Sequence, residues 1–177
     1  LALANALRLL RLDEQMPFDL QVVCAMSYEV DPDCLQLGTL VNQSVLGFPV
    51  EHLGDLQGAV ERTGNMPKWI LDLEPIGIAL AGTPCTATSI AQKRHATGAQ
   101  SALHSEKGRL IFVWHKTVHA LRNVLGPTKV VSVSEFPSTS SQADSVQLDK
   151  LMGRPCIVNA KDWGRAVRHR HFRCDPF

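Results

Sequence analysis

Four side chains that can do chemistry stand where apolar stretches of the sequence end. Cys85 follows Pro84 just after the stretch IGIALAG, and Glu135 closes the stretch KVVSVSE. Glu29 and Asp55 follow two earlier stretches, nearer the beginning of the chain. A cysteine thiolate is a nucleophile, and a carboxylate beside it can exchange a proton or accept hydrogen bonds. Together, the four positions indicate a reactive site that includes Cys85.

The apolar stretches alternate with segments that have helical spacing. Strands are expected over residues 18–27, 48–55, 76–82, 128–135 and 155–160. Helices are expected over residues 1–12, 33–43, 58–65, 106–123 and 141–153. Such alternation predicts parallel strands joined by right-handed crossovers, and hence a Rossmann-like, doubly wound α/β fold with a mainly parallel sheet. Because ligands bind beyond the carboxyl ends of such strands, the four chemical side chains should surround one cleft.

Each of these positions also has a purely structural interpretation. An acidic residue after a strand often caps the next helix, and a single strand-end cysteine can be a packing residue. The polar stretch 91–107 can be a lid over the site or an ordinary surface loop. The basic segment 161–173 can be a solvated face or a surface for nucleic acid. The coincidence of four chemical side chains at successive strand ends favours a functional site.

Composition limits the class of protein. The chain has 177 residues, about one domain, and a formal net charge of +1, so any nucleic-acid binding must come from a local patch. Its five cysteines form no C-x-x-C pair, so we expect neither a zinc ribbon nor a disulfide framework, and no metal site. We expect reduced thiols, no membrane span and no secretion signal. The first residues read as the middle of a longer protein.

Several motifs resemble one enzyme family in their order along the chain. They are SYEVDPD, HLGD, GTPCTATSI, EKGRLIF, VVSVSEF and PCIVNAKDWGRAVRHRHF. Over most of its 177 residues the chain resembles the C5-cytosine DNA methyltransferases, especially their de novo branch. The resemblance implies that residues 1–177 are a partial catalytic domain with an incomplete S-adenosylmethionine-dependent methyltransferase fold. It also implies a nuclear location in a eukaryote and a cytoplasmic one otherwise.

The resemblance implies a covalent mechanism on a flipped cytosine. Cys85 would be the nucleophile that adds to C6, which makes C5 able to attack a methyl sulfonium. Pro84 would help to aim the thiol. Glu135 would bind the N3 and N4 edge of the base, and Arg170 would complement the base carbonyl and support Glu135.

The resemblance also implies binding residues for S-adenosyl-L-methionine. Glu29 would accept hydrogen bonds from the two ribose hydroxyls, with Asp31 as the competing candidate. Asp55 would accept from the adenine amino group. Val30 and Leu56 could pack against the faces of the adenine ring.

Further basic residues would hold the nucleic acid. Arg165, Arg168 and Arg173 are expected at the DNA backbone. DNA is preferred to RNA as the partner, and a paralogous methyltransferase subunit is a possible protein partner.

The chain departs from the family pattern at several points. The glycine-rich first motif and the target-recognition region are absent from the sequence, Thr86 follows the cysteine, and Phe136 stands where the family has Asn. Two alternatives therefore stay open beside an active DNA enzyme. One is a catalytically inactive regulatory or DNA-binding module, and the other is a tRNA cytosine-5 methyltransferase. Flanking sequence would separate them.

Overall fold

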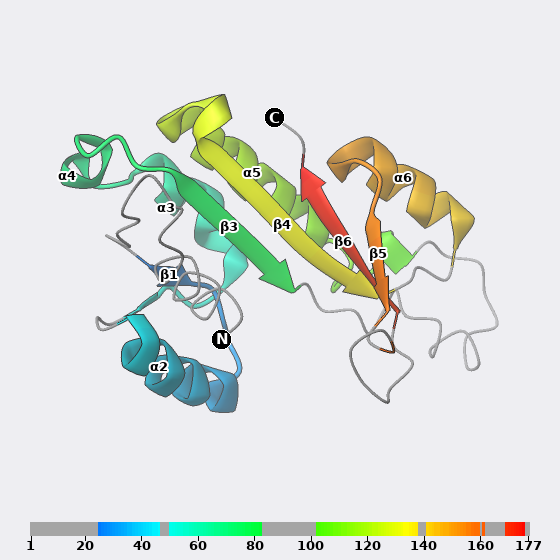
Figure 1. Cartoon of the computed structure of the whole chain (residues 1–177), viewed down its shortest axis with the longest axis horizontal. Helices are drawn as coiled ribbons and strands as arrows, with labels where there is room; N and C mark the ends of the chain where they lie inside the picture. The colour runs from blue at the N-terminus through cyan, green and yellow to red at the C-terminus, as the bar shows by residue number, and fades with distance from the viewer. Residues whose placement is uncertain are drawn as a thin grey trace. The chain divides into compact units, whose positions relative to one another are not determined.

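A computed structural model of the chain describes residues 25–46, 50–82, 102–137, 141–159, 161 and 169–175. The chain consists of two compact units, residues 1–59 and residues 60–177. Figure 1 labels the helices and strands of both. Expectations that fall on residues 1–24, including the first helix and most of the first strand, lie outside the described residues.

The first unit contains a two-stranded parallel sheet. Its elements are β1 (Met26–Ser27), α2 (Pro32–Leu46), β2 (Glu51–His52) and the short helix η1 (Leu56–Gly58). The helix expected over residues 33–43 is confirmed as α2. The Asp31 carboxylate caps its start by accepting hydrogen bonds from the backbone N–H groups of Asp33 and Cys34 at 2.9 and 3.1 Å. A 2.7 Å hydrogen bond between Thr39 Oγ1 and His52 Nε2 ties α2 to β2.

The second unit contains a four-stranded sheet in the order β3-β4-β6-β5. Strands β3 and β4 are parallel, whereas β6 runs antiparallel to both of its neighbours. The elements in chain order are α3 (Ala59–Gly64), α4 (Lys68–Leu71), β3 (Gly77–Gly82), η3 (Ala102–His104), α5 (Leu110–Leu125), η4 (Pro127–Lys129), β4 (Val130–Pro137), α6 (Gln142–Met152), β5 (Cys156–Asn159) and β6 (His169–Asp175).

The mixed α/β class is confirmed, and the doubly wound, Rossmann-like arrangement stays a prediction. The described residues form two sheets, and the larger one contains an antiparallel strand that we did not expect. That strand, β6, lies in the segment that we interpreted as a basic surface. Its sequence HRHFRCD has a single large apolar residue, Phe172, so no apolar alternation indicates a strand.

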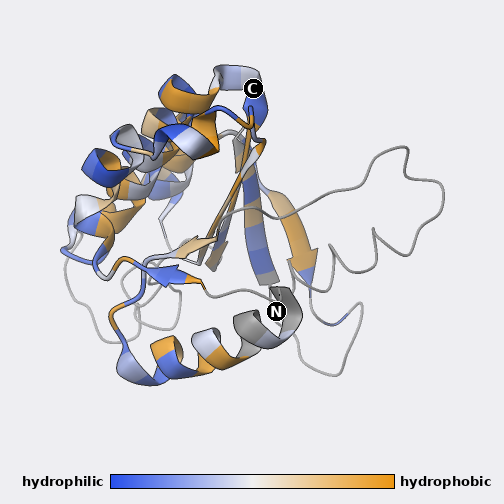
Figure 2. Cartoon of the chain, turned by 90° about the vertical axis from the view of Figure 1, so that its left-hand side faces the viewer, coloured by the Kyte–Doolittle hydropathy of each residue, from blue (hydrophilic) through white to orange (hydrophobic). Residues whose placement is uncertain are grey.

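Helices α5 and α6 cover the same face of the larger sheet. The Trp114 indole N–H of α5 donates to Ser134 Oγ of β4 at 2.7 Å. Ser134 pairs with Arg173 of β6, which bonds Asp149 of α6. Figure 2 shows these helices on one side of the sheet, with orange apolar segments among them. The core therefore lies between this face and the two helices.

The opposite face of the larger sheet leaves apolar and charged side chains accessible. Ile78 and Leu80 of β3 and Val131 of β4 are exposed. Strand geometry places Glu135 on this face as well, because side chains alternate and Ser134 and Phe136 are buried on the other side. This accessible face carries the candidate site.

Candidate active site

Two of the expected catalytic side chains meet on the accessible face. Glu135 of β4 pairs across the sheet with Phe172 of β6, and Arg170 lies two residues along from Phe172. Both side chains therefore project from the same face. Arg170 Nε donates to Glu135 Oε1 at 2.5 Å, and the two side chains are 20% and 42% exposed. A ligand can thus reach a carboxylate that is already oriented by a guanidinium.

The end of β3 lies beside this pair. Gly82, the last residue of β3, pairs with Glu135 in the parallel ladder between β3 and β4. The arrowheads of β3 and β4 point the same way in Figure 1. Pro84 and Cys85 follow Gly82 by two and three residues but lie outside the described residues. The structure therefore places Gly82, the last described residue before the Pro-Cys segment, next to Glu135.

The first unit brings two other expected residues to one edge. Ser27 at the end of β1 pairs with His52 at the end of β2, and the strands are parallel. Glu29 comes two residues after Ser27, and Asp55 comes three residues after His52. Both carboxylates thus follow the carboxyl ends of neighbouring parallel strands, as a ligand-binding edge requires.

Glu29 also has a local structural role. Its Oε1 accepts hydrogen bonds from the backbone N–H groups of Val30 at 2.8 Å and Asp31 at 3.0 Å. Both bonds use the same oxygen, so the second oxygen retains acceptor capacity for hydroxyl groups. The neighbouring Val30 is 71% exposed and offers an apolar surface beside the carboxylate.

Asp55 likewise combines a structural contact with an exposed position. Its Oδ1 accepts from the backbone N–H of Gln57 at 3.0 Å and so caps η1, in which Leu56 is half-buried. The preceding Gly54 has a φ of +73°, a conformation that favours glycine. Helix capping, the structural interpretation of these acidic positions, is therefore real for both Asp31 and Asp55.

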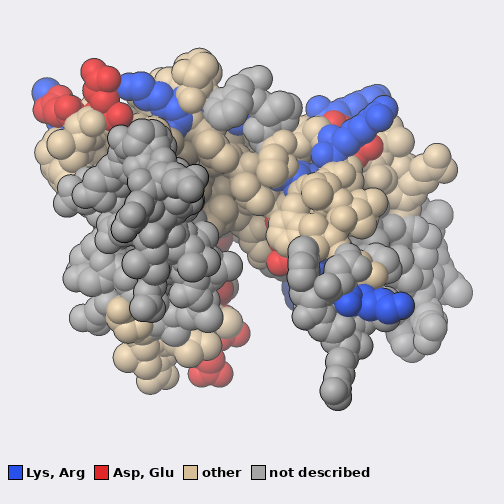
Figure 3. Space-filling model, in the orientation of Figure 1, with Lys and Arg blue, Asp and Glu red and all other residues tan. Residues whose placement is uncertain are grey.

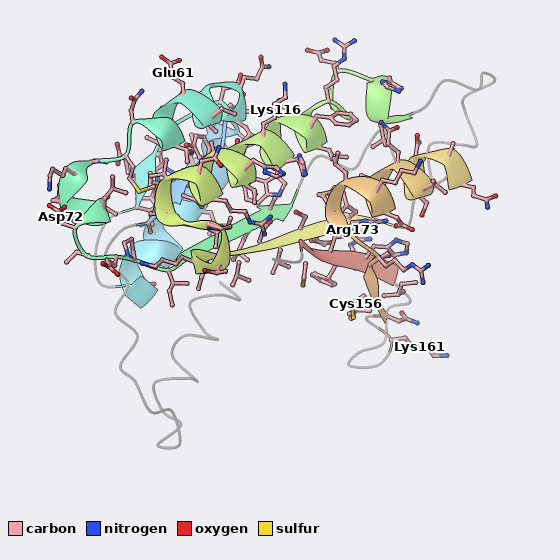
Figure 4. All side chains as sticks on the ribbon, turned by 90° about the horizontal axis from the view of Figure 1, so that it is seen from above. Glu61, Asp72, Lys116, Cys156, Lys161 and Arg173 are labelled. Atoms are coloured by element: carbon pink, nitrogen blue, oxygen red, sulfur yellow. The ribbon has the colours of Figure 1, made fainter. Side chains whose placement is uncertain are left out.

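The expectation that Arg173 contacts DNA does not hold. Arg173 is 1% exposed and faces α6, where its Nη1 donates to Asp149 Oδ1 at 2.6 Å and to the carbonyl oxygen of Gly153 (Figure 4). A guanidinium enclosed in this way cannot reach a phosphate. Sequence alone could not predict this role, because nothing distinguishes Arg173 from the other basic residues of its segment and its partner Asp149 is 24 residues away. Arg165 and Arg168 lie outside the described residues.

On the face of the second unit seen in Figure 3, the described Lys and Arg side chains form no continuous stripe. Some of the cations are neutralised locally: Lys68 pairs with Asp72 at 2.7 Å, and Lys129 pairs with Glu74 at 3.1 Å. The described residues include no cluster of three or more side chains that could hold a metal ion. They also include no helix that is long and apolar enough to cross a bilayer.

Cys34 is the one described thiol whose pKa shifts clearly. It is exposed and sits in the first turn of α2. The negative charge of Asp31 raises the pKa of the Cys34 thiol, with smaller contributions from desolvation and from Glu29. A helix N-terminus usually favours the thiolate, but here the surrounding carboxylates oppose it. Cys34 is thus a poor candidate for a nucleophile.

The chain was also compared with known proteins. No protein-family model matches it, and no curated protein matches it at a significant level.

Proposed function

We propose that the chain is the catalytic part of a DNA cytosine-5 methyltransferase that uses S-adenosylmethionine. The observation that carries the proposal is the Glu135–Arg170 ion pair beside Gly82 at the carboxyl end of β3. Cys85 follows Gly82 by three residues, which span at most about 11 Å of chain, and we propose that its thiol acts in the region of this pair. A nucleophile, a carboxylate and a guanidinium within one such region suit attack on a planar, polar base.

The proposed reaction follows from these groups. The Cys85 thiolate forms a bond to C6 of the cytosine, and the electron pair of the C5–C6 double bond moves toward C5. S-adenosylmethionine would supply the methyl group that C5 takes up, and its sulfur would leave as a neutral thioether. Loss of the C5 proton to a base and release of the thiolate restore the ring. Glu135 holds the N3 and N4 edge, which stabilises the electron-rich ring, and Arg170 orients Glu135 and complements the carbonyl.

The cofactor residues are proposed in the first unit. S-adenosylmethionine supplies an electrophilic methyl group. The second oxygen of Glu29 suits the ribose hydroxyls, because a carboxylate accepts two such bonds. The exposed Asp55 suits the adenine amino group, and Val30 and Leu56 suit the ring faces. Asp31 stays the competing candidate for the ribose, because it too accepts two backbone N–H bonds through one carboxylate oxygen, Oδ1.

A methyltransferase-like module without activity is the second candidate. One observation favours it: Phe136, which replaces the Asn expected by the resemblance, is 2% exposed and belongs to the core. Its side chain lies on the helix-covered face, next to Ser134 in the alternation of β4, and so projects away from the face of Glu135. The resemblance implies that this Asn helps to order the Pro-Cys loop, and a buried phenylalanine cannot make the same polar contact.

Transfer of a labelled methyl group separates these functions. We expect the protein to methylate cytosine in duplex DNA, and Glu135→Gln to lower the rate by about a hundredfold or more. Glu74→Gln is the matched control, because Glu74 is an exposed carboxylate paired with Lys129 and should leave the rate unchanged. Methylation of tRNA alone would support the RNA enzyme. Cofactor binding without transfer would support the inactive module.

A further inference from the structure

The register of β6 against β4 is not set by apolar side chains. The strand reads HRHFRCD, and its single large apolar residue, Phe172, lies on the accessible face opposite Glu135. Register is normally specified where one face of a strand is apolar and buried. A shift by one residue would move Arg170 to the helix-covered face and away from Glu135. Another feature must therefore hold β6 in place.

Arg173 supplies directional contacts on the helix-covered face. Its Nη1 donates to Asp149 Oδ1 at 2.6 Å and to the carbonyl oxygen of Gly153, both at the end of α6. Gly153 closes that helix with a φ of +75°, and its N–H donates to the Asp149 carbonyl oxygen at 3.1 Å. The two acceptors therefore belong to one rigid helix end. A shift by one residue would turn Arg173 to the other face, and a shift by two would move it about 7 Å along the strand, away from both acceptors.

The cost of burying Arg173 argues for such a role. The side chain is 1% exposed, and its Nε and Nη2 are buried without hydrogen-bond partners among the described residues. A well-packed apolar residue in the place of a buried ion pair is often as stable or more stable. Buried charges are best attested where they select one register over another. The position of Arg173 fits that use.

We propose that Arg173, together with Asp149 and the Gly153 carbonyl, locks the register of β6 and thereby positions Arg170 against Glu135. Arg173 is a positioning residue, since it acts through Arg170 and lies on the opposite face of the strand. Its effect on methyl transfer rests on the proposed function, whereas the lock itself does not.

The lock can be tested without any enzymatic activity. In the full chain, the Arg170 Nε–H is observed by ¹H–¹⁵N NMR, and backbone amide exchange is measured along β6. Arg173→Met removes the donors but keeps an unbranched stem that fills the space. We expect the ion-paired Arg170 signal to be lost and amide protection in β6 to fall by about tenfold, the effect of one charge-assisted hydrogen bond. Amide protection in α5 should stay unchanged.

Asp149→Asn is the conservative control, because it keeps an acceptor oxygen at the same place. It should retain the Arg170 signal and β6 protection. A wild-type signal and wild-type protection in Arg173→Met would overturn the proposal. If that variant does not fold, Asp149→Ala removes one of the two acceptors: reduced β6 protection supports the lock, and unchanged protection overturns it. Because none of these measurements uses methyl transfer, a failed lock and a failed enzymatic function give different results.

Discussion

Phe136 illustrates how the function of a residue depends on the face of the strand from which it projects. It follows Glu135 directly, yet Glu135 is accessible and Phe136 is 2% exposed. The alternation of β4 places Phe136 in the core beside the helices. Replacing it with the Asn of the family would therefore put an amide in an apolar position, and would not by itself rebuild a contact at the site.

Phe136→Asn should destabilise the fold by about 3–5 kcal/mol, since it removes a buried aromatic ring and buries an amide. Urea denaturation of the full chain measures this change. Phe136→Leu, which keeps an apolar side chain, should cost less. Equal stability of the Asn variant and the wild type would show that Phe136 is not a core residue.

Cys34 gives a second prediction at the scale of single residues. Because Asp31 raises the pKa of the Cys34 thiol, less thiolate is present near pH 8 than for a free cysteine. Asp31→Asn should lower that pKa and speed alkylation of Cys34, while Asn still caps α2. Mass spectrometry resolves the labelled site. Asp33→Asn should have a smaller effect, because Asp33 contributes least to the shift, and a larger effect of Asp33 would contradict this explanation.

At the scale of elements, α6 is held at both ends by side chains that the fold positions. Ser141 Oγ accepts from the backbone N–H of Asp144 at 3.4 Å at the start of the helix. Arg173 bonds the Gly153 carbonyl at its end. The proposed lock on the register of β6 uses the end of this helix, so the helix bears on the candidate site.

Ser141→Ala should lower the free energy of unfolding by about 1 kcal/mol, because it removes the N-cap acceptor of α6. Ser145→Ala is the matched control in the same helix, and it should be neutral or slightly stabilising, since alanine has the higher helix propensity. The midpoints of urea denaturation compare the two variants. A larger loss in Ser145→Ala than in Ser141→Ala would refute the assigned cap.

The elements differ in how far sequence alone could predict them. Apolar stretches predicted β3 and β4, helical spacing predicted α5, and the helix expected over residues 141–153 is confirmed as α6. Periodicity could not predict β6, because polar side chains occupy both of its faces and its partner β4 lies far away in the sequence. The role of Arg173 could not be predicted for the same reason, since it depends on a contact between distant parts of the sequence. Its ion pair with Asp149 spans 24 residues and exists only after β6 is placed beside β4.

At the scale of the molecule, we propose a separate binding role for each of the two units. We assign cofactor binding to Glu29 and Asp55 after the two parallel strands of the first unit. We assign base binding to Glu135 and Arg170 on the accessible face of the second. Both assignments use the carboxyl ends of parallel strands, which the alternation of strands and helices predicted. The proposed nucleophile, Cys85, follows β3 and is the residue that gives the site its chemistry.

Covalent trapping tests this central assignment most directly. A DNA duplex that carries 5-fluorocytosine should form an adduct with the protein, because methylation leaves fluorine at C5, with no proton to lose, and the thioether persists. The band should appear on a denaturing gel only when S-adenosylmethionine is present. It should vanish in Cys85→Ser, since a hydroxyl is far less ionised than a thiol. It should persist in Cys156→Ser, which changes an exposed cysteine of β5. An adduct that survives Cys85→Ser, or no adduct in a protein that binds both cofactor and DNA, would contradict the assignment.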